Sequence, residues 1–460
     1  MAPLYTRTLV VDGVTPVGVY RVLREQAERG SFLLESVVPG ERWGRYSILG
    51  YRPRTEIVLR PEPGRDPFAR LAELAPSGEE PGADVAARFA RAHVGLIAYD
   101  VVHYATKVDP WPELEQEQRP IARLVSDTTV IVFDNVNHTA TIAAHDPADL
   151  ERAEHDVLRA SALPAFAPPD PGALPGEVDV NVSDAEYCRV VERAKEYIRA
   201  GDAFQIVPAR TFSTPVGAAD PFDVYRALRV LSPAPYMYLF ELPASEGVPR
   251  VAIAGASPET LVRVQEGRIV LRPIAGTRKR GATPERDREL AEEMLADPKE
   301  RAEHVMLIDL ARNDVGRVAR TGTVRVPERM IVERYSHVMH IVSEVTGELE
   351  PSLGPWDVIR ATFPAGTLTG APKVRAMQII RELERRPRGV YGGALGYVTR
   401  GTDLDLAIGI RTVVMAGDRF EVTAGAGIVA DSVPELEAQE TRNKARAALA
   451  SIAAAHRRTG

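Results

Sequence analysis

Two pairs of glutamates with the same spacing stand far apart in the chain. Glu300 and Glu303 form the first pair, and Glu437 and Glu440 form the second. Residues three apart project from the same side of a helix, one turn above the other, so each pair should present two carboxylates on one face. Asp297 is a suitable N-cap for the first helix, and Glu300 could close a capping box with it.

Two helices that each offer a carboxylate pair can bind one hard divalent cation between them. Ligands that are all oxygen atoms, with no cysteine nearby, favour magnesium over zinc. A simpler interpretation is also available. Glu300 can serve only to cap its own helix, and Glu440 can form an ordinary surface ion pair with Lys444, four residues later. The spacing alone leaves both interpretations open.

The bulk properties are those of a large soluble protein. A chain of 460 residues exceeds what one core usually supports, so we expect two domains or one large composite. Its net charge of −7 and the lack of a Lys/Arg block give no reason to expect nucleic acid as a partner. No apolar run is long enough for a membrane span, and no signal peptide is evident. The single cysteine, Cys188, excludes an internal disulfide framework, so a cytoplasmic location is expected.

The hydrophobic pattern predicts runs of strands with helices grouped between them. The expected strands are 31–36, 44–50, 56–59, 93–99, 123–133, 139–144, 204–212, 236–240, 251–256, 260–264, 268–271, 335–345, 392–400, 405–414 and 420–424, the last three as one meander. The expected helices are 15–29, 183–200, 284–312, 355–362, 371–384 and one that begins after a capping box at 432–435. Short polar turns between neighbouring strands favour an α+β fold with two packed, largely antiparallel sheets, helices outside and the active site in the cleft between them.

A stretch rich in proline and glycine interrupts this pattern. Residues 163–180 are too rich in both for a core element, so we interpret them as a linker. The linker divides the chain into an N-terminal region, 1–162, and a C-terminal region, 181–460.

Two glycine-rich segments invite comparison with phosphate loops. In the segment from Gly366 to Lys373 the lysine follows a proline and precedes no serine or threonine, which argues against a nucleotide-binding loop. The glycines there and at Gly425 and Gly427 are better suited to bringing backbone amides close to a bound carboxylate.

Three further residues occupy unusual positions for scaffold. Glu259 is expected at a bend between two strands, and Arg411 lies within the expected strand 405–414. His340 shares a strand face with valines, an environment that lowers the pKa of an imidazole and leaves it able to accept a proton near neutrality. A strand histidine or arginine, taken singly, is more often a satisfied structural side chain than a catalytic one.

Taken together, these segments resemble the chorismate-utilising enzymes, most closely the large subunits (component I) of the anthranilate synthases. The resemblance extends over nearly the whole chain. Its most specific parts are Pro-Ile-Ala-Gly-Thr at 273–277, the segments 297–304 and 309–314, Tyr-Ser-His-Val-Met-His at 335–340, Gly-Thr-Leu-Thr-Gly-Ala-Pro-Lys at 366–373, and the segments 425–428 and 440–444.

The resemblance implies a role for each matching residue. A Mg²⁺ ion that binds the ring carboxylate of chorismate would be held by Glu300, Glu303, Glu437 and Glu440. Catalysis would involve Glu259 as the acid that protonates the departing hydroxyl, His340 as the base that takes the ring proton, and Thr367. The substrate would be held by Gly276, Thr277, Tyr391, Arg411, Gly425, Ala426, Gly427 and Lys444.

Two positions bear on the choice among related activities. Isochorismate-forming relatives carry a lysine at the position of Gln205, where it activates water, and glutamine cannot act as that base. Many aminodeoxychorismate synthases carry a lysine nucleophile at the position of Ala275. The resemblance therefore implies addition of free ammonia and formation of anthranilate and pyruvate, with aminodeoxychorismate synthesis or a catalytically silent tryptophan-binding regulator as alternatives.

The resemblance also implies a partner and an inhibitor. Cys188 lacks the context of an amidotransferase nucleophile, so a separate glutamine amidotransferase subunit should supply the ammonia, in a heterotetramer. Tryptophan would act as a feedback inhibitor in a site formed by Glu35, Ser36, Pro235, Tyr236 and Met237, although the first segment can also be an ordinary strand end.

Overall fold

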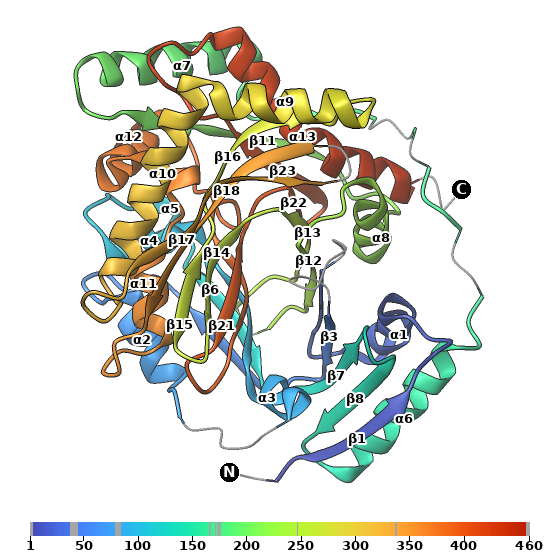
Figure 1. Cartoon of the computed structure of the whole chain (residues 1–460). Coiled ribbons are helices and arrows are strands. Elements are labelled where there is room, and N and C mark those ends of the chain that lie inside the picture. Colours follow the sequence, from blue (N-terminus) through green and yellow to red (C-terminus); the bar gives the residue numbers. More distant parts are fainter. Residues whose placement is uncertain are drawn as a thin grey trace.

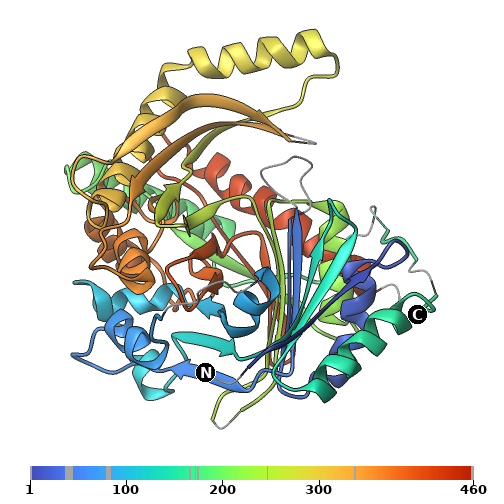
Figure 2. The same cartoon turned by 60° about the horizontal axis from the view of Figure 1, so that its bottom comes forward.

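Two large β-sheets face each other in this computed structural model (Figures 1 and 2). The structure describes residues 3–36, 45–78, 84–164, 167–170, 172, 176–245, 247–335 and 338–456. Every strand pair recorded among these residues is antiparallel, which agrees with the short turns in the sequence. The α+β class predicted from the sequence, with two packed antiparallel sheets and helices outside, is confirmed.

The first sheet has 11 strands in the described part of the chain, in the order β1-β8-β7-β3-β2-β12-β13-β22-β23-β11-β9. Its strands are β1 (Tyr5–Val10), β8 (Thr139–Ala144), β7 (Thr129–Asp134), β3 (Tyr46–Tyr51), β2 (Ser31–Glu35), β12 (Tyr236–Leu242), β13 (Val251–Ser257), β22 (Thr412–Ala416), β23 (Arg419–Gly425), β11 (Ala209–Pro215) and β9 (Asp179–Val180).

Among the described residues the second sheet has 10 strands. Nine follow the path β16-β18-β15-β14-β21-β20-β5-β6-β4, and β17 pairs with β18 beside it. Its strands are β16 (Ile274–Lys279), β17 (Arg325–Arg334), β18 (Val338–Glu348), β15 (Arg268–Leu271), β14 (Thr260–Gln265), β21 (Leu404–Ile408), β20 (Ala394–Val398), β5 (His93–Ile97), β6 (Ala122–Ser126) and β4 (Thr55–Leu59). A separate short pair joins β10 (Gln205–Ile206) to β19 (Gly370–Ala371).

Helices cover the outer face of each sheet (Figure 1). Over the first sheet lie α1 (Pro16–Leu23), α6 (Pro147–Ala160), α8 (Pro221–Leu231) and α13 (Pro434–His456). Over the second lie α2 (Pro67–Leu74), α4 (Val102–Ala105), α10 (Pro298–Gly316), α11 (Pro355–Thr362) and α12 (Lys373–Leu383). The remaining helices are α3 (Val85–Arg91), α5 (Pro112–Gln116), α7 (Asp184–Arg199), α9 (Pro284–Ala296) and the 3-10 turns η1 (Arg24–Gln26), η2 (Tyr99–Val101) and η3 (Gly366–Leu368). No helix in the described ranges is both long and apolar enough to span a bilayer.

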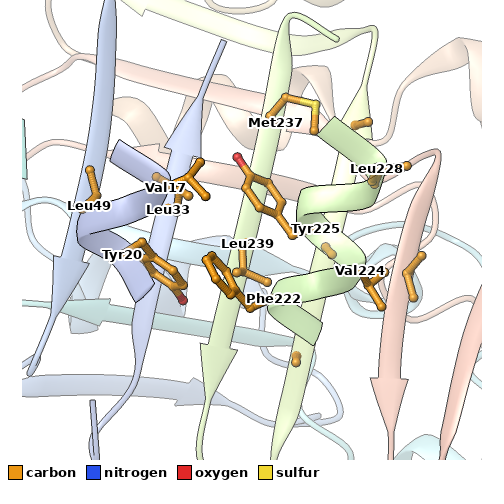
Figure 3. Packing of buried hydrophobic residues seen from close by; sticks show 14 of the residues in the cluster. Val17, Tyr20, Leu33, Leu49, Phe222, Val224, Tyr225, Leu228, Met237 and Leu239 are labelled. Atoms are coloured by element: carbon orange, nitrogen blue, oxygen red, sulfur yellow. The ribbon is translucent and has the colours of Figure 1, made fainter. Parts of the chain in front are cut away.

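The hydrophobic core has three layers because each sheet buries both faces. The inner layer between the sheets includes Phe32 and Phe240 of the first sheet and Leu96 of the second. The outer layer of the first sheet is seen in Figure 3, where Tyr20 of α1 and Phe222 of α8 pack with their ring centroids 5.7 Å apart. Burying both faces explains why many strands read as continuous apolar runs rather than as alternating ones.

Three predicted strands are wrong because the chain changes sheet or breaks its pairing within them. The expected strand 123–133 divides at Asp127, whose positive φ of 51° ends β6 in the second sheet before β7 begins in the first. The expected strand 405–414 divides in the same way at Arg411, with φ 49°, so the expected meander spans both sheets. The expected strand 204–212 divides around Pro208 into β10 and β11. Apolar periodicity continues through these breaks, which hides them in the sequence.

The two regions on either side of the expected linker share both sheets. β2 pairs with β12 in the first sheet, and β5 pairs with β20 in the second. The expected linker, 163–180, follows α6 and includes the two-residue strand β9. Its residues 165–166, 171 and 173–175 lie outside the described residues. The division into a regulatory and a catalytic region stays a prediction.

Candidate functional site

Helix α10 carries the first carboxylate pair at its N-terminus. The Asp297 side chain accepts hydrogen bonds from the amides of Lys299 (2.9 Å) and Glu300 (3.3 Å), so the predicted N-cap is confirmed. The capping box is wrong, because the Glu300 carboxylate does not turn back to the N-cap. Its Oε1 instead accepts from Arg278 Nη1 at 2.9 Å, which directs this carboxylate toward β16.

Glu303 lies one turn further along the same face and is more enclosed. Its Oε1 accepts a hydrogen bond from Gln205 Nε2 at 3.1 Å. Burial raises the pKa of Glu303, and the negative charges of Glu300 and Glu440 raise it further. Because Glu440 belongs to α13, the charge of one helix acts on a carboxylate of the other.

The second pair is carried by α13 (Pro434–His456). Burial and the neighbouring Glu440 raise the pKa of Glu437, and the ammonium of Lys299 on α10 lowers it. Lys444 Nζ lies 2.7 Å from Glu440 Oε1 and donates to the Gly425 carbonyl at 3.1 Å. The ion pair expected under the simpler interpretation is therefore present. This ion pair does not exclude the metal site, because Glu440 can pair with Lys444 and still belong to the group of four glutamates.

The donor set fits a hard cation such as magnesium. Among the residues that the structure describes, no three acidic, histidine or cysteine side chains form a ready-made set of metal ligands. Magnesium does not require one, because it keeps several of its waters and usually takes one or two protein carboxylates together with ligand oxygens. Glu303 and Glu437, whose pKa values are raised by burial and by like charge, would regain stability beside a cation.

Glu259 lies where the chain crosses from the first sheet to the second, between β13 and β14, as the predicted bend required. The residue is 8% exposed, and burial raises the pKa of its carboxyl to about 7. Thr367 Oγ1 in η3 donates to Glu259 Oε1 at 3.0 Å and, with the charges of Lys444 and Arg411, limits that rise. A carboxyl that keeps its proton near neutrality can act as a general acid.

Arg411 lies at the return crossing, from the second sheet to the first. The amide of Ala256 donates to the Arg411 carbonyl at 3.2 Å, and the amide of Ile408 donates to the Glu259 carbonyl at 3.1 Å. These two bonds tie the crossings together, so the guanidinium of Arg411 and the carboxyl of Glu259 interact electrostatically. Arg411 has a left-handed backbone conformation, which ends the strand predicted here and directs the side chain toward Glu259.

His340 is oriented by a β-bulge in the neighbouring strand. The register between β16 and β18 shifts at Gly276, whose φ is +59°. The bulge aims the Gly276 carbonyl at His340 Nδ1 (3.1 Å), and Thr277 Oγ1 lies 3.0 Å from the same nitrogen. A carbonyl can only accept, so Nδ1 carries the proton and Nε2 holds the free lone pair. Burial lowers the pKa of this imidazole, which keeps it a base near neutrality.

Gly276 cannot be replaced without disturbing the carboxylates. A Cβ at this position would lie 3.1 Å from Glu300 Oε2, and its φ already favours glycine. This close approach places the bulge between the histidine and the first carboxylate pair.

The segment from Gly425 to Gly427 forms another wall of the site. A Cβ on Gly425 would lie 2.7 Å from the Tyr391 hydroxyl, and a Cβ on Gly427 would lie 2.9 Å from Gln205 Nε2. The amide of Ala426 donates to the Pro208 carbonyl at 3.2 Å. Both glycines are therefore needed for close packing, and Gln205 links this wall to Glu303.

Sequence reasoning missed two buried cations behind the site. Arg388 donates to the carbonyls of Leu368 (2.8 Å) and Val207 (2.6 Å), and its guanidinium lies 5.4 Å from the Tyr391 ring centroid. Lys373 Nζ pairs with Asp314 at 2.8 Å, with both side chains almost fully buried. Nothing in the local pattern distinguishes these residues from surface cations. Only the near-motif from Gly366 to Lys373 marked the lysine.

The predicted inhibitor residues lie on two adjacent strands of the first sheet. Glu35 of β2 is directly opposite Met237 of β12. The Glu35 carboxylate accepts from the Tyr225 hydroxyl at 2.6 Å and lies 3.2 Å from Arg229 Nε. Figure 3 shows Tyr225 of α8 and Met237 of β12 on the same side of the first sheet.

The other inhibitor residues divide between the two faces of this sheet. Ser36 Oγ is buried without a hydrogen-bond partner among the described residues, and Pro235 is buried beside β12. Tyr236 points to the opposite face from Met237, and its hydroxyl bonds Thr260 (2.6 Å) and Asp405 (2.9 Å) in the second sheet. The strand pairing thus brings Glu35 and Met237 together, and the Tyr236 side chain points away from them, toward the second sheet.

This geometry defines the class of protein. The site combines a protonated carboxyl, a neutral imidazole, several cations and the carboxylates of α10 and α13, and the charge of Arg411 acts on both Glu259 and His340. Such a set suits acid-base chemistry on a small polyanion. The chain belongs to the family described as chorismate binding enzyme, whose sequence profile matches residues 39–450.

Relatives and a solved structure narrow the comparison. The chain is 43% identical over 482 residues to anthranilate synthase component 1 of Pseudomonas putida, covering 98% of this chain and 95% of that protein. It is 42% identical to the Aquifex aeolicus protein of the same name, covering 98% and 94% respectively. The crystal structure of anthranilate synthase component I from Streptococcus pneumoniae superimposes with a TM-score of 0.76 at 34% identity, covering 96% of this chain and 99% of that one.

Proposed function

We propose that this chain converts chorismate and ammonia to anthranilate and pyruvate, as component I of an anthranilate synthase. The observation that carries the proposal is the combination of an acid and a base in one protein. Burial raises the pKa of the Glu259 carboxyl to about 7, and His340 Nδ1 donates its proton to the Gly276 carbonyl. Acid and base are thus both in the protonation states that the reaction needs near neutral pH.

The first half of the reaction needs a proton donor at the leaving hydroxyl. Glu259 donates its proton to the C4 hydroxyl of chorismate, which departs as water while ammonia adds at C2. Arg411 and Lys444 supply positive charge for the substrate carboxylates, and the backbone of the Gly425 to Gly427 segment allows close approach. Thr367 keeps the acid in position through its hydrogen bond.

The second half needs a base. His340 Nε2 takes the C2 proton, the new C2–C3 double bond completes the aromatic ring, and the C3–O bond breaks to release enolpyruvate, which becomes pyruvate on protonation. The lone pair is available because the Gly276 bulge holds the other ring proton on Nδ1. The products are anthranilate, pyruvate and water, which balance chorismate plus ammonia.

We also propose magnesium as the cofactor. Glu300, Glu303, Glu437 and Glu440 would hold it, and the bound ion would neutralise a substrate carboxylate in a chain of net charge −7. The mutual charge repulsion of these glutamates, which raises the pKa values of Glu303 and Glu437, supports this assignment.

A partner must supply the ammonia. The only cysteine, Cys188 in α7, has its pKa raised by burial, which disfavours the thiolate that an amidotransferase requires. We propose a separate glutamine amidotransferase subunit, assembled with this chain as a heterotetramer, and a cytoplasmic location for the complex. We further propose feedback inhibition by tryptophan bound beside Ser36 and Met237, because the buried Ser36 hydroxyl has no partner among the described residues.

Anthranilate fluorescence tests the proposed reaction. The purified chain is incubated with chorismate, magnesium and ammonium, with ammonium omitted as the control. Fluorescent anthranilate and equimolar pyruvate are expected. A non-fluorescent 4-amino product would instead indicate an aminodeoxychorismate synthase, an outcome that the absence of an amine at Ala275 argues against.

A further inference from the structure

A polar and aromatic network lies on the side of His340 away from the Gly276 bulge. Glu333 of β17 is directly opposite His340 of β18 in the strand register. The Tyr335 ring meets the His340 ring edge to face, with centroids 5.7 Å apart and planes at 60°. The imidazole is therefore held on one side by the bulge and on the other by an aromatic ring.

The Tyr335 ring is itself anchored. Its hydroxyl donates to Glu333 Oε2 at 2.8 Å, and Arg272 Nη2 donates to Glu333 Oε1 at 2.5 Å. Both carboxylate oxygens of Glu333 are thus engaged by groups from different segments. Arg272 is 7% exposed, so this interaction is shielded from solvent on the guanidinium side.

Arg272 connects this network to the bulge through the chain. It follows the last residue of β15, and Pro273 and β16 come directly after it. The same guanidinium therefore fixes the start of the strand that presents Gly276 and the carboxylate that anchors Tyr335. A rotation of the imidazole would have to move the tyrosine ring or break the hydrogen bond to the Gly276 carbonyl.

We propose that Tyr335, anchored through Glu333, is a positioning residue for His340 in the pyruvate-releasing half of the reaction. The inference rests on the proposed function, and it assigns Tyr335 no contact with the substrate. Its ring limits the orientations of the imidazole, so Nε2 is presented to the C2 proton. Loss of the ring should slow proton removal and leave the amination step unchanged, because Glu259 lies on a different segment.

The test separates the two halves of the reaction. The His340→Ala variant, with chorismate and ammonium, should accumulate the aminated intermediate, which is then purified. Supplying this intermediate to wild-type protein and to the Tyr335 variants measures the elimination alone. Chorismate consumption measures the amination.

Tyr335→Leu is expected to slow elimination about tenfold, the order of an aromatic pair interaction, with chorismate consumption within about twofold of wild type. Tyr335→Phe keeps the ring and should recover most of the rate. Chorismate deuterated at C2 should give a larger isotope effect on anthranilate formation with Tyr335→Leu than with wild type, because proton removal then limits the rate.

Two glutamates provide a matched comparison if the leucine variant fails to fold. Glu333 and Glu344 both contact Arg272, with Glu344 Oε2 3.9 Å from Nε. Of the two, only Glu333 accepts the hydrogen bond from the Tyr335 hydroxyl. Glu333→Gln should slow elimination selectively, and Glu344→Gln should not. Equal slowing of both half-reactions, equal effects of the two glutamine variants, or no slowing at all would overturn the positioning role. Failure of wild-type protein to form anthranilate would instead reject the proposed function itself.

Discussion

Replacing Glu259 with glutamine should remove the proposed general acid and stabilise the folded protein above neutral pH. The carboxyl is 8% exposed, and burial raises its pKa from an ordinary 4.5 to about 7. The folded protein therefore binds this proton more tightly than the unfolded chain does. Glutamine keeps the shape and can still accept the hydrogen bond from Thr367.

The sign and size of the effect follow from linkage. A carboxyl with a raised folded pKa keeps its full contribution to stability below pH 4.5 and loses it as the pH rises through 7. At about 1.4 kcal/mol for each pH unit, the difference between 4.5 and about 7 corresponds to about 3 kcal/mol lost by the wild type. The glutamine variant carries no such loss, so the two proteins should differ most at pH 8 and least near pH 4.5.

Urea unfolding followed by circular dichroism at pH 5 and pH 8 measures the difference. The variant should gain about 2.5 kcal/mol on the wild type between these conditions, because the wild type has already lost part of its stability at pH 5. Its kcat should fall about 10² to 10⁴-fold for loss of a general acid. Glu151→Gln, at an exposed position on α6, is the control and should change neither quantity. A variant that is no more stable than wild type at pH 8 would refute the argument that burial of Glu259 outweighs the stabilisation of its charged form by Thr367, Lys444 and Arg411.

Three further predictions concern the other parts of the site. Ser36→Ala should raise the tryptophan concentration for half-inhibition by about two- to tenfold, the order of one hydrogen bond, with turnover unchanged; an unaltered inhibition curve would remove Ser36 from the inhibitor site. Glu303→Gln should weaken magnesium binding, measured by calorimetry in the absence of substrate, and chelator should stop wild-type turnover reversibly; unchanged binding would exclude Glu303 as a ligand. Lys373→Met should destabilise the protein by about 3 to 5 kcal/mol because it leaves the buried Asp314 carboxylate unpaired, and adding Asp314→Leu should recover much of the loss; additive losses would contradict this pairing.

Features that depend on neighbours along the chain were predictable. The Asp297 cap, the helix that begins at Ser183 and the short turn between β14 and β15 follow from residue type and short spacing, and the structure confirms them. The two glutamate pairs each share a helix face for the same reason. The resemblance of the quoted motifs extended these local signals to an activity, and the family assignment confirms its broad class.

Features that depend on contacts between distant segments were not predictable. Periodicity placed Arg411 inside a strand, whereas its left-handed backbone lies at a crossing between the sheets. Glu300 bonds Arg278 instead of its own N-cap, because β16 packs beside α10 and offers a charged donor. The Tyr335 and Glu333 network likewise needs β17, a strand that the sequence pattern did not reveal.

The sequence by itself determined which chemical groups are available and which of them share a helix or strand face, because those relations are set by the repeat of the backbone. Only the tertiary structure decided which groups meet and in which protonation state. Glu259 holds its proton near pH 7 because the two crossing segments bury it, and His340 offers Nε2 because a bulge in another strand occupies Nδ1. Burial and pairing are properties of the packed chain, so no reading of local spacing could have supplied them.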